Sequence, residues 1–364
     1  MRTRFVLAIL AAVAIAGCSG GSGLGLGTQN NNNSQATQQE RAQAATEAGL
    51  APVEQGGLEV GLFNGNMGVP LSTSRSPLST FAASPNGSCN NGVEYTVTVV
   101  SPTQTQYETK YFYDKACVSL AKNVVALVTI NSPSNESIVR TAKNYNLAGL
   151  LLSTRNTNYA ITGAPLNFSA VLTGDVLIGS SSSPAVQFGH QFTIAPQSGS
   201  VYTIAANSGK VVNNGNPRIN ESFGHMGVLS NGTMTIDSST GNLTFAGSHA
   251  GTFFKGPLGS LTLSSTPPFT VSGGTDLGTN NVSGNVVFDK YGNIVSVSIT
   301  GTLWNGDAIS VTSSGTPPGV SINGSITESS GQNVATFQVD QNGNGIITYA
   351  NGQQALIIDW HVVR

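Results

Sequence analysis

Charged residues are scarce in this sequence: Asp, Glu, Lys and Arg make up 9% of its 364 residues, and no run of basic residues occurs. Binding to nucleic acid requires clustered Lys and Arg that neutralise phosphates. A nucleic-acid partner is therefore not expected. Gly, Ser, Thr and Asn are abundant instead, a composition typical of turn-rich β proteins outside the cytoplasm.

A long apolar run is also missing. The most apolar segment, residues 5–16, is shorter than the roughly 20 residues that a helix needs to span a bilayer. A membrane-spanning anchor is therefore not expected. The segment follows Arg2 and Arg4, and positive charges before a short apolar run are typical of a signal peptide.

Cysteine is rare, and the first of the three cysteines is the most informative residue of the chain. Cys18 follows the apolar run and the small pair Ala16-Gly17. This segment resembles the lipobox of bacterial lipoprotein precursors. The resemblance implies that residues 1–17 are a signal peptide removed before Cys18, and that Cys18 carries a diacylglyceryl group and other acyl chains such as palmitate.

The resemblance also implies a location. Ser19 after the cysteine is, within that class, typical of passage to the outer membrane or the cell surface. Several acyl chains on one residue would hold the protein firmly to the membrane, because each buried methylene contributes about 0.8 kcal/mol. An ordinary secretion signal cleaved after Ala14-x-Ala16 is the alternative.

The two remaining cysteines, Cys89 and Cys117, form an isolated pair. In an oxidising compartment such a pair is most simply a disulfide. The closed loop would contribute about 3 to 4 kcal/mol in the chain-entropy model. A redox or nucleophilic cysteine is the alternative, but the pair lacks a C-x-x-C spacing and a nearby histidine.

Residues 18–57 are predicted to form a lipidated flexible tether. They include a run of four asparagines and many Gln, Ala and Gly residues, but almost no large apolar side chains that could be buried. Residues 38–48 could form a short polar helix, which would be marginal in isolation. Residues 58–88 are broken by Gly and Pro, so irregular structure packed on the body is expected there.

The body is predicted to be all-β. Period-two alternation, as in Val93-Glu-Tyr-Thr-Val-Thr-Val99, indicates half-buried antiparallel strands. We expect an antiparallel meander that forms a barrel or a two-sheet sandwich. The sequence suggests two regions, residues 58–206 and 207–364, because a Gly- and Asn-rich stretch begins at residue 207.

The second region contains a repeat of about 50 residues. Three similar turns begin at Asp237, Asp289 and Asp340, and a Thr-Pro-Pro sequence also occurs twice. Each aspartate should accept a hydrogen bond from a backbone N–H two residues on, and Gly or Asn should adopt the left-handed conformation of a tight turn. The predicted structural turn residues are Asp237, Gly241, Asn242, Asp289, Gly292, Asn293, Asp340, Gly343 and Asn344.

No metal site and no cofactor are predicted. The Asp-x-Asn-x-Asn-Gly segment from Asp340 matches the first half of a calcium loop, but Asn351 stands where a bidentate Glu is expected. His190, His225 and His249 could in principle bind zinc, but they lack a short metal-ligand spacing. Ordinary structural roles explain these residues more simply.

No catalytic residue is predicted either. Asp359 and His361 could form part of a hydrolytic triad, but no Gly-x-Ser-x-Gly sequence accompanies them, and a solvated strand end is the simpler interpretation. Tyr111 and Tyr113 share a strand face and could stack on sugar rings, although aromatic residues at such spacing belong more often to a core.

The sequence predicts a cell-envelope lipoprotein that acts without catalysis as a structural, adhesive or ligand-binding β module, with an envelope protein or a glycan as candidate partner. Low charge, many turns and repeats favour this hypothesis. The alternative is an envelope hydrolase acting on glycans or peptides. An enzyme should have a pocket where several acids or a Ser-His-Asp set converge, whereas a binding module should have a cavity, a sheet edge or an aromatic face.

Overall fold

The computed structural model describes residues 36–63, 87–132, 134–164, 167–213, 221–257 and 261–363, except for the side chains of residues 59–63, 206–212, 221–231 and 257. The described residues belong to one compact unit, Ala36–Arg364. Cys18, the predicted signal peptide and residues 18–35 of the predicted tether lie outside the described residues.

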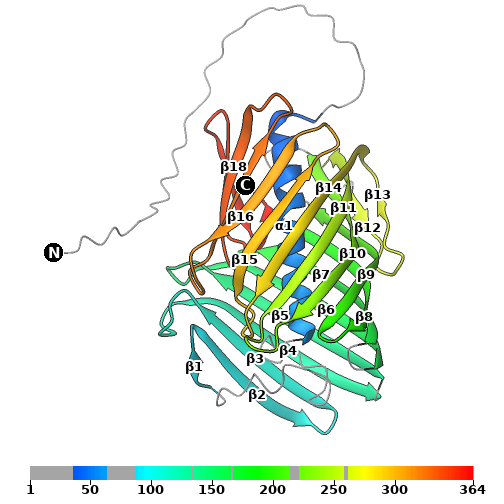
Figure 1. Cartoon of the computed structure of the whole chain (residues 1–364), viewed down its shortest axis with the longest axis vertical. Helices are drawn as coiled ribbons and strands as arrows, with labels where there is room; N and C mark the ends of the chain where they lie inside the picture. Colours follow the sequence, from blue (N-terminus) through cyan, green and yellow to red (C-terminus); the bar gives the residue numbers. More distant parts are fainter. Residues whose placement is uncertain are drawn as a thin grey trace, which may run out of the picture. The chain divides into compact units, whose positions relative to one another are not determined.

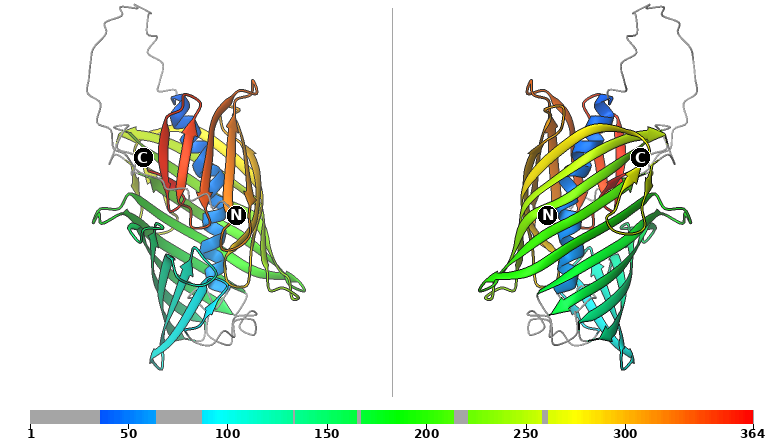
Figure 2. Two further views of the ribbon diagram at one scale, coloured as in Figure 1. Left: turned by 90° about the vertical axis from the view of Figure 1, so that its left-hand side faces the viewer. Right: turned by 90° about the vertical axis from the view of Figure 1, so that its right-hand side faces the viewer.

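Nineteen strands form one antiparallel sheet in which chain neighbours are also sheet neighbours, apart from one excursion between β11 and β14. The predicted all-β antiparallel meander is therefore confirmed. The sheet curves around helix α1 (Figures 1 and 2). Its strands are β1 (Cys89–Asn90), β2 (Val93–Ser101), β3 (Gln104–Phe112), β4 (Leu120–Ser132), β5 (Asn135–Tyr145), β6 (Leu151–Ala164), β7 (Asn167–Ile178), β8 (Val186–Ser198), β9 (Val201–Asn213), β10 (Glu221–Ile236), β11 (Leu243–Pro257), β14 (Thr275–Phe288), β15 (Ile294–Thr302), β16 (Ala308–Ser314), β17 (Ser321–Thr327), β18 (Asn333–Asp340), β19 (Gly345–Tyr349), β20 (Gln354–Ile358) and β21 (His361–Val362).

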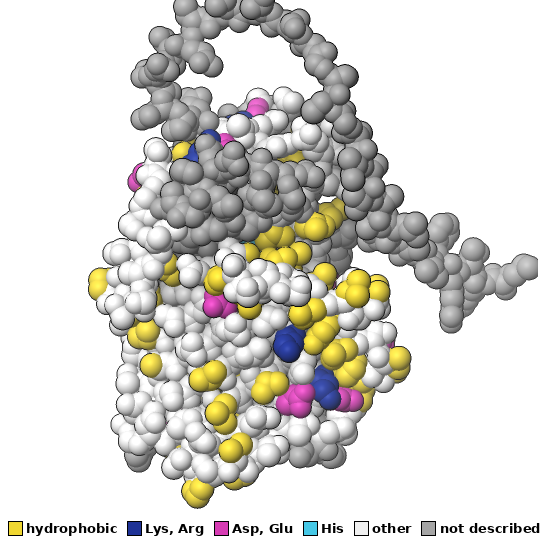
Figure 3. Space-filling view, turned by 180° about the vertical axis from the view of Figure 1, so that it is seen from behind, with side chains coloured by type: hydrophobic (Ala, Val, Ile, Leu, Met, Phe, Trp, Pro, Cys, Tyr) yellow, Lys and Arg dark blue, Asp and Glu magenta, His cyan; other side chains and the backbone are white. Residues whose placement is uncertain are grey.

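Period-two alternation separates the two faces of the sheet. In β17, Ile322 and Ile326 are buried and Ser325 is exposed. The core lies between the inner face of the sheet and the helix, and each large apolar side chain buried there contributes about 1.5 to 3 kcal/mol. On the face seen in Figure 3, the outer surface consists mostly of uncharged polar side chains and backbone, with scattered apolar side chains.

Helix α1 (Gln38–Phe63) begins at a capping box. The backbone N–H of Glu40 donates to Oγ1 of Thr37 at 3.3 Å, and the backbone N–H of Thr37 donates to Oε2 of Glu40 at 2.6 Å. This reciprocal pair satisfies two of the backbone donors that a helix start leaves free. The sequence Thr-x-x-Glu therefore determines where the helix begins.

The described side chains of α1 are buried on several sides of the helix. Ala42, Ala45 and Ala48 have no exposed surface. A Cβ atom on Gly49 would lie only 2.5 Å from Cδ1 of Ile309 on β16. Small residues thus allow the helix to lie directly against the inner face of the sheet.

The prediction of a flexible tether is therefore wrong for residues 38–57, which belong to the core. Their large apolar side chains are few because the surrounding sheet leaves space mainly for small ones. The short helix considered for residues 38–48 is longer than expected, and its marginal intrinsic stability is compensated by packing. None of the described helical residues forms a segment of the length and hydropathy needed to cross a bilayer.

The boundary predicted between residues 206 and 207 falls inside β9. This strand pairs with β8 on one side and with β10 on the other, so the sheet is continuous across the boundary. The two predicted regions are consequently parts of one folded unit.

The two segments that separate the three repeated turns differ in structure. Between the turns at Asp237 and Asp289, the chain forms the long neighbours β11 and β14 and a small separate hairpin, β12 (Thr262–Leu263) with β13 (Val271–Ser272). Between the turns at Asp289 and Asp340, it forms four strands of the main sheet, β15 to β18. The turns recur, whereas the segments between them differ.

The predicted disulfide is present. Cys89 in β1 is bonded to Cys117 in the loop between β3 and β4, with the two Cα atoms 6.0 Å apart. The bond therefore joins β1 to the loop that follows β3.

Candidate functional site

The three repeated turns have the hydrogen bonds expected from the sequence. Oδ1 of Asp237, Asp289 and Asp340 accepts a hydrogen bond at 2.8 Å from the backbone N–H two residues on. The glycine of each turn, Gly241, Gly292 and Gly343, has a positive φ. The turn residues that follow these glycines are Asn242, Asn293 and Asn344, and the backbone oxygen of each accepts a hydrogen bond from the N–H of the aspartate.

The first of the three turns differs from the other two in its surroundings. The side chain of Asp237 is exposed, whereas Asn293 is buried and lines a cavity. The turn that begins at Asp340 reaches the same cavity through Gln341 and Asn342. Two of the three predicted structural turns therefore also contribute to a candidate site.

The turn beginning at Asp340 is held against the last hairpin of the chain. The backbone N–H of Trp360 donates to the carbonyl oxygen of Gly343 at 2.9 Å, and that of Asp359 donates to Oδ1 of Asn344 at 3.1 Å. Asp359 and Trp360 both have positive φ values, 52° and 77°. Such conformations cost about 1–3 kcal/mol each for non-glycine residues and occur preferentially at functional sites.

Three glutamates of α1 lie on one side of the helix. Glu40, Glu47 and Glu54 are spaced by seven residues, which is close to two helical turns. All three are buried. An uncompensated buried charge is very costly, so each requires partners from the sheet.

Each glutamate has such partners. Oε1 of Glu40 lies 3.0 Å from Nζ of Lys255 on β11. Oε1 of Glu47 accepts the backbone N–H of Val362 at 3.2 Å and also a hydrogen bond from Nδ2 of Asn213. These contacts fasten the helix to strands far apart in the sequence.

Glu54 is at the centre of this network. Its Oε1 accepts a hydrogen bond from Nη1 of Arg155 at 2.6 Å and lies 3.2 Å from Nε2 of His361. Nε of Arg155 also donates to Oδ2 of Asp359 at 3.0 Å. Burial alone would raise the pKa of Glu54, but the charges of His361 and Arg155 hold it well below its usual range.

His361 is held in its charged form. Burial opposes the charge, but Glu54 and Glu47 raise the pKa of His361 to about 10. The solvated strand end predicted for Asp359 and His361 is therefore wrong, because both residues are buried. They do not form the Asp-His pair of a triad either: Asp359 binds Arg155, and His361 binds the helix glutamates.

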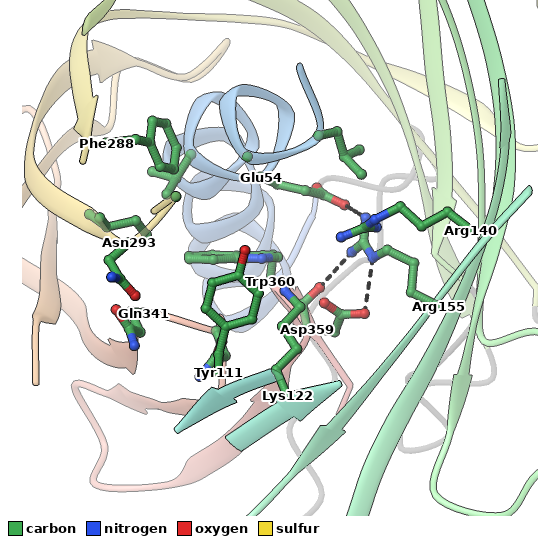
Figure 4. Close-up of a pocket in the computed structure, with 16 residues that line it drawn as sticks. Glu54, Tyr111, Lys122, Arg140, Arg155, Phe288, Asn293, Gln341, Asp359 and Trp360 are labelled. Atoms are coloured by element: carbon green, nitrogen blue, oxygen red, sulfur yellow. Dashed lines mark hydrogen bonds and ion pairs between the residues drawn. The ribbon is translucent and has the colours of Figure 1, made fainter. Parts of the chain in front are cut away.

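A cavity of about 60 Å³, lined by both polar and apolar side chains, lies beside this network. Figure 4 shows Tyr111, Lys122, Arg140, Asn293, Gln341 and Trp360 around it, together with the ion pairs of Arg155. The residues come from β3, β4 and β5, from the turns beginning at Asp289 and Asp340, and from the last hairpin. The cavity therefore lies where the first and last strands of the sheet approach the helix.

Several buried polar atoms of the cavity have no hydrogen-bond partner among the described residues. They include Nη1 of Arg140, Oη of Tyr111, Nδ2 of Asn342, Oδ1 of Asn293 and Oε1 of Gln341. Each such group costs about 1–3 kcal/mol if nothing binds it. A volume of 60 Å³ is sufficient for roughly four waters, and is far below the 300–1,000 Å³ typical of drug-sized ligands.

The chemistry available in the cavity depends on the side chains that line it. Its described lining contains no Ser, Thr, Cys or His. It includes two acids, Glu54 and Asp359, but both are engaged by Arg155. A glycosidase needs one carboxylic acid that is protonated, and the lowered pKa of Glu54 disfavours this role for that residue.

The other buried histidines do not join a metal site. Burial lowers the pKa of His190 and of His249 to about 4. Within the described part of the chain, no three His, Cys, Asp or Glu side chains are grouped to hold a metal ion. Oδ1 of Asp340 is turned toward the backbone N–H groups of its own turn, which is the predicted structural role.

The roles of the helix glutamates and of the basic residues of the sheet were not predicted from the sequence. Two signals were available: the Thr-x-x-Glu capping box at Thr37, and the seven-residue spacing of Glu40, Glu47 and Glu54. No sequence signal pairs Arg140 with Asn342, which come together only in the fold. Comparison with known protein families, curated proteins and solved structures finds no match to this chain.

Proposed function

We propose that this chain is a lipoprotein of the bacterial cell envelope whose β body binds a small polar ligand without catalysing a reaction. Residues 1–17 would direct export, and Cys18 would carry the lipid that holds the protein at the outer membrane or the cell surface. The lipobox-like segment before Cys18 supports the anchoring. The buried polar atoms around the cavity support the binding.

The single observation that carries the binding proposal is the set of unpartnered polar atoms around one cavity. Arg140 and Tyr111 are both 6% exposed, yet Nη1 and Oη have no partner among the described residues. Buried polar groups are nearly always hydrogen-bonded, so such a concentration requires an explanation. A ligand that completes these hydrogen bonds would remove their energetic cost.

The position of α1 supports a mechanical connection between the β body and the proposed lipid on Cys18. The first described residue, Ala36, is 18 residues after Cys18, and α1 begins two residues later. Because α1 is held in the core by its buried glutamates, a force on the N-terminal segment would act directly on the body. A lipid anchor would thus hold the module through its centre.

The binding part is tested by thermal unfolding of the full mature chain against small anions, glycans, peptidoglycan fragments, haem and calcium. A ligand that binds only the folded state at a hundredfold excess over its Kd adds about 2.7 kcal/mol of stability. We expect one class to raise the midpoint. The same class should have less effect on Tyr111→Phe, which keeps the ring and removes the hydroxyl. A midpoint that no class moves would overturn the proposal.

The anchoring part is tested by labelling cells with an alkynyl fatty acid and by mass spectrometry of the mature N-terminus. We expect label on the wild type and on Cys89→Ser, and none on Cys18→Ala. The mature N-terminus should be an acylated Cys18. An unlabelled protein cleaved after Ala16 would show that the ordinary secretion signal is correct.

A further inference from the structure

Several of the hydrogen-bond donors around the cavity carry a positive charge. Arg140 on β5 and Lys122 on β4 both line the cavity, and Tyr111 on β3 adds a hydroxyl. Lys122 has no ion pair within 4.0 Å among the described residues, and it is only partly buried. The three strands are consecutive neighbours in the sheet, so their inner faces form one surface.

The carboxylates nearby are already engaged. Glu54 and Asp359 both bind Arg155. Oδ1 of Asp289 accepts backbone N–H groups at 2.8 and 2.9 Å, and Oδ1 of Asp340 does so at 2.8 and 3.0 Å. The charge of Arg155 is therefore directly compensated, whereas those of Arg140 and Lys122 have no such close partner.

The electrostatics of Lys122 agree with this geometry. Burial lowers the pKa of its ammonium group to about 8, and the charges of Arg140 and Arg155 lower it further against the attraction of Asp359 and Asp340. The surroundings thus disfavour a cation at this position. A bound anion would remove that penalty.

The opposite side of the cavity offers acceptors. Nδ2 of Asn293 donates to Oδ2 of Asp289 at 3.1 Å, and because a carboxylate only accepts, this contact directs Oδ1 of Asn293 elsewhere. That oxygen and Oε1 of Gln341 are both buried without a hydrogen-bond partner in the described structure. A ligand that fills the cavity should therefore accept hydrogen bonds on one side and donate on the other.

We propose that the cavity binds a small oxyanion that retains a proton, of the phosphate type, with Arg140, Lys122 and Tyr111 donating to its oxygens and Asn293 and Gln341 accepting from its hydroxyl. Arg and Lys are the usual phosphate-binding side chains. The five heavy atoms of a phosphate fit a volume that holds roughly four waters. This inference rests on the proposed binding function and specifies its ligand.

The test uses the full mature chain, purified in non-ionic detergent without phosphate. Binding of inorganic phosphate is measured by titration calorimetry and by broadening of the ³¹P signal, with sulfate and chloride at equal ionic strength as comparison ions. We expect phosphate to bind at least tenfold more tightly than sulfate, which carries no proton at neutral pH. Glycerol phosphate is included to distinguish a free ion from the terminal phosphate of a larger molecule, and binding of either supports the proposal.

Two variants assign the binding to the cavity. Arg140→Gln should weaken phosphate binding at least tenfold, whereas Lys143→Gln, which removes one positive charge from the exposed face of the same strand, should leave it unchanged. Tyr111→Phe keeps the packing and should weaken binding even if Arg140→Gln does not fold.

Equal binding of phosphate, sulfate and chloride would overturn the inference, and so would unchanged binding by Tyr111→Phe and Arg140→Gln. If phosphate does not bind but another class in the ligand panel raises the unfolding midpoint, only the oxyanion inference fails. If nothing in the panel binds, the proposed binding function fails with it.

Discussion

Oε1 of Glu54, on the central helix, accepts a 2.6 Å hydrogen bond from Nη1 of Arg155, which lies 101 residues later in β6. Arg155 in turn binds Asp359, another 204 residues along the chain. The three residues thus join the helix, β6 and the last hairpin. Because all three are buried, their charges depend on one another for compensation.

Removing the central cation should destabilise the protein strongly. Arg155→Gln leaves Glu54 and Asp359 without their shared partner, and breaking a buried pair in this way typically costs about 3–5 kcal/mol. Urea unfolding of the full chain measures the loss. The matched control is Lys110→Gln, whose pair with Glu94 is 3.7 Å long and partly exposed, and should cost about 0–1 kcal/mol. Similar losses in the two variants would contradict the network described above.

Gly343 should tolerate substitution less well than another turn glycine with the same backbone. Gly343 and Gly352 have similar φ values, +77° and +79°. A Cβ atom on Gly343 would lie 2.6 Å from Cγ of Trp360. A Cβ atom on Gly352 would have no described atom within 4 Å apart from those of its two chain neighbours. Gly352→Ala should cost about 1 kcal/mol from backbone strain alone. Gly343→Ala should cost clearly more, because the last hairpin must move. Equal midpoints in urea unfolding would show that Trp360 is not packed there.

Mild acid should weaken the fold through two buried histidines. His190 and His249 have pKa values lowered to about 4 by burial, compared with about 6.5 in an unfolded chain. Their neutral forms therefore contribute stability above pH 6.5 that is lost as the pH falls toward 4, up to about 3 kcal/mol for each. Unfolding free energies at pH 7 and pH 5 measure this slope. His190→Gln should flatten it, and an unchanged slope would contradict the assignment.

Alkaline pH should act through His361 in the opposite sense. Its pKa is raised to about 10 by the helix glutamates, so its stabilising charge is fully present below pH 6.5 and is lost as the pH rises through 10. We expect the difference in unfolding free energy between wild type and His361→Gln to shrink steadily from pH 7 to pH 10. A difference that stays constant over this range would mean that His361 is neutral in the folded protein.

The sheet was predictable because its signals are local. Alternation as in residues 93–99, the Asp-initiated turns and the isolated pair Cys89 and Cys117 each depend on residues close in sequence or on composition. The helix was not predicted at its full length, because residues such as Ala45 and Gly49 fit a core only when a sheet surrounds them. Their lack of large apolar side chains therefore looked like a tether.

The candidate site was less predictable than the fold. Asp340 and Asn293 were identified, but only as turn residues. The role of Arg140 depends on the absence of a partner, and that follows from the positions of residues up to 200 places away in the chain. Two features of the helix could have been recognised in the sequence: the capping box at Thr37 and the glutamate spacing, since carboxylates repeated every seven residues indicate one helix face.

Helix α1 belongs to the core that the sheet encloses. Hydrogen–deuterium exchange of the full chain tests this placement most directly. We expect backbone amides around Glu47 and Glu54 to exchange as slowly as those of β17 and β18. Arg155→Gln should accelerate their exchange more than Lys110→Gln does. Complete exchange of the helix amides within seconds, while the sheet stays protected, would show that residues 38–57 are a tether after all.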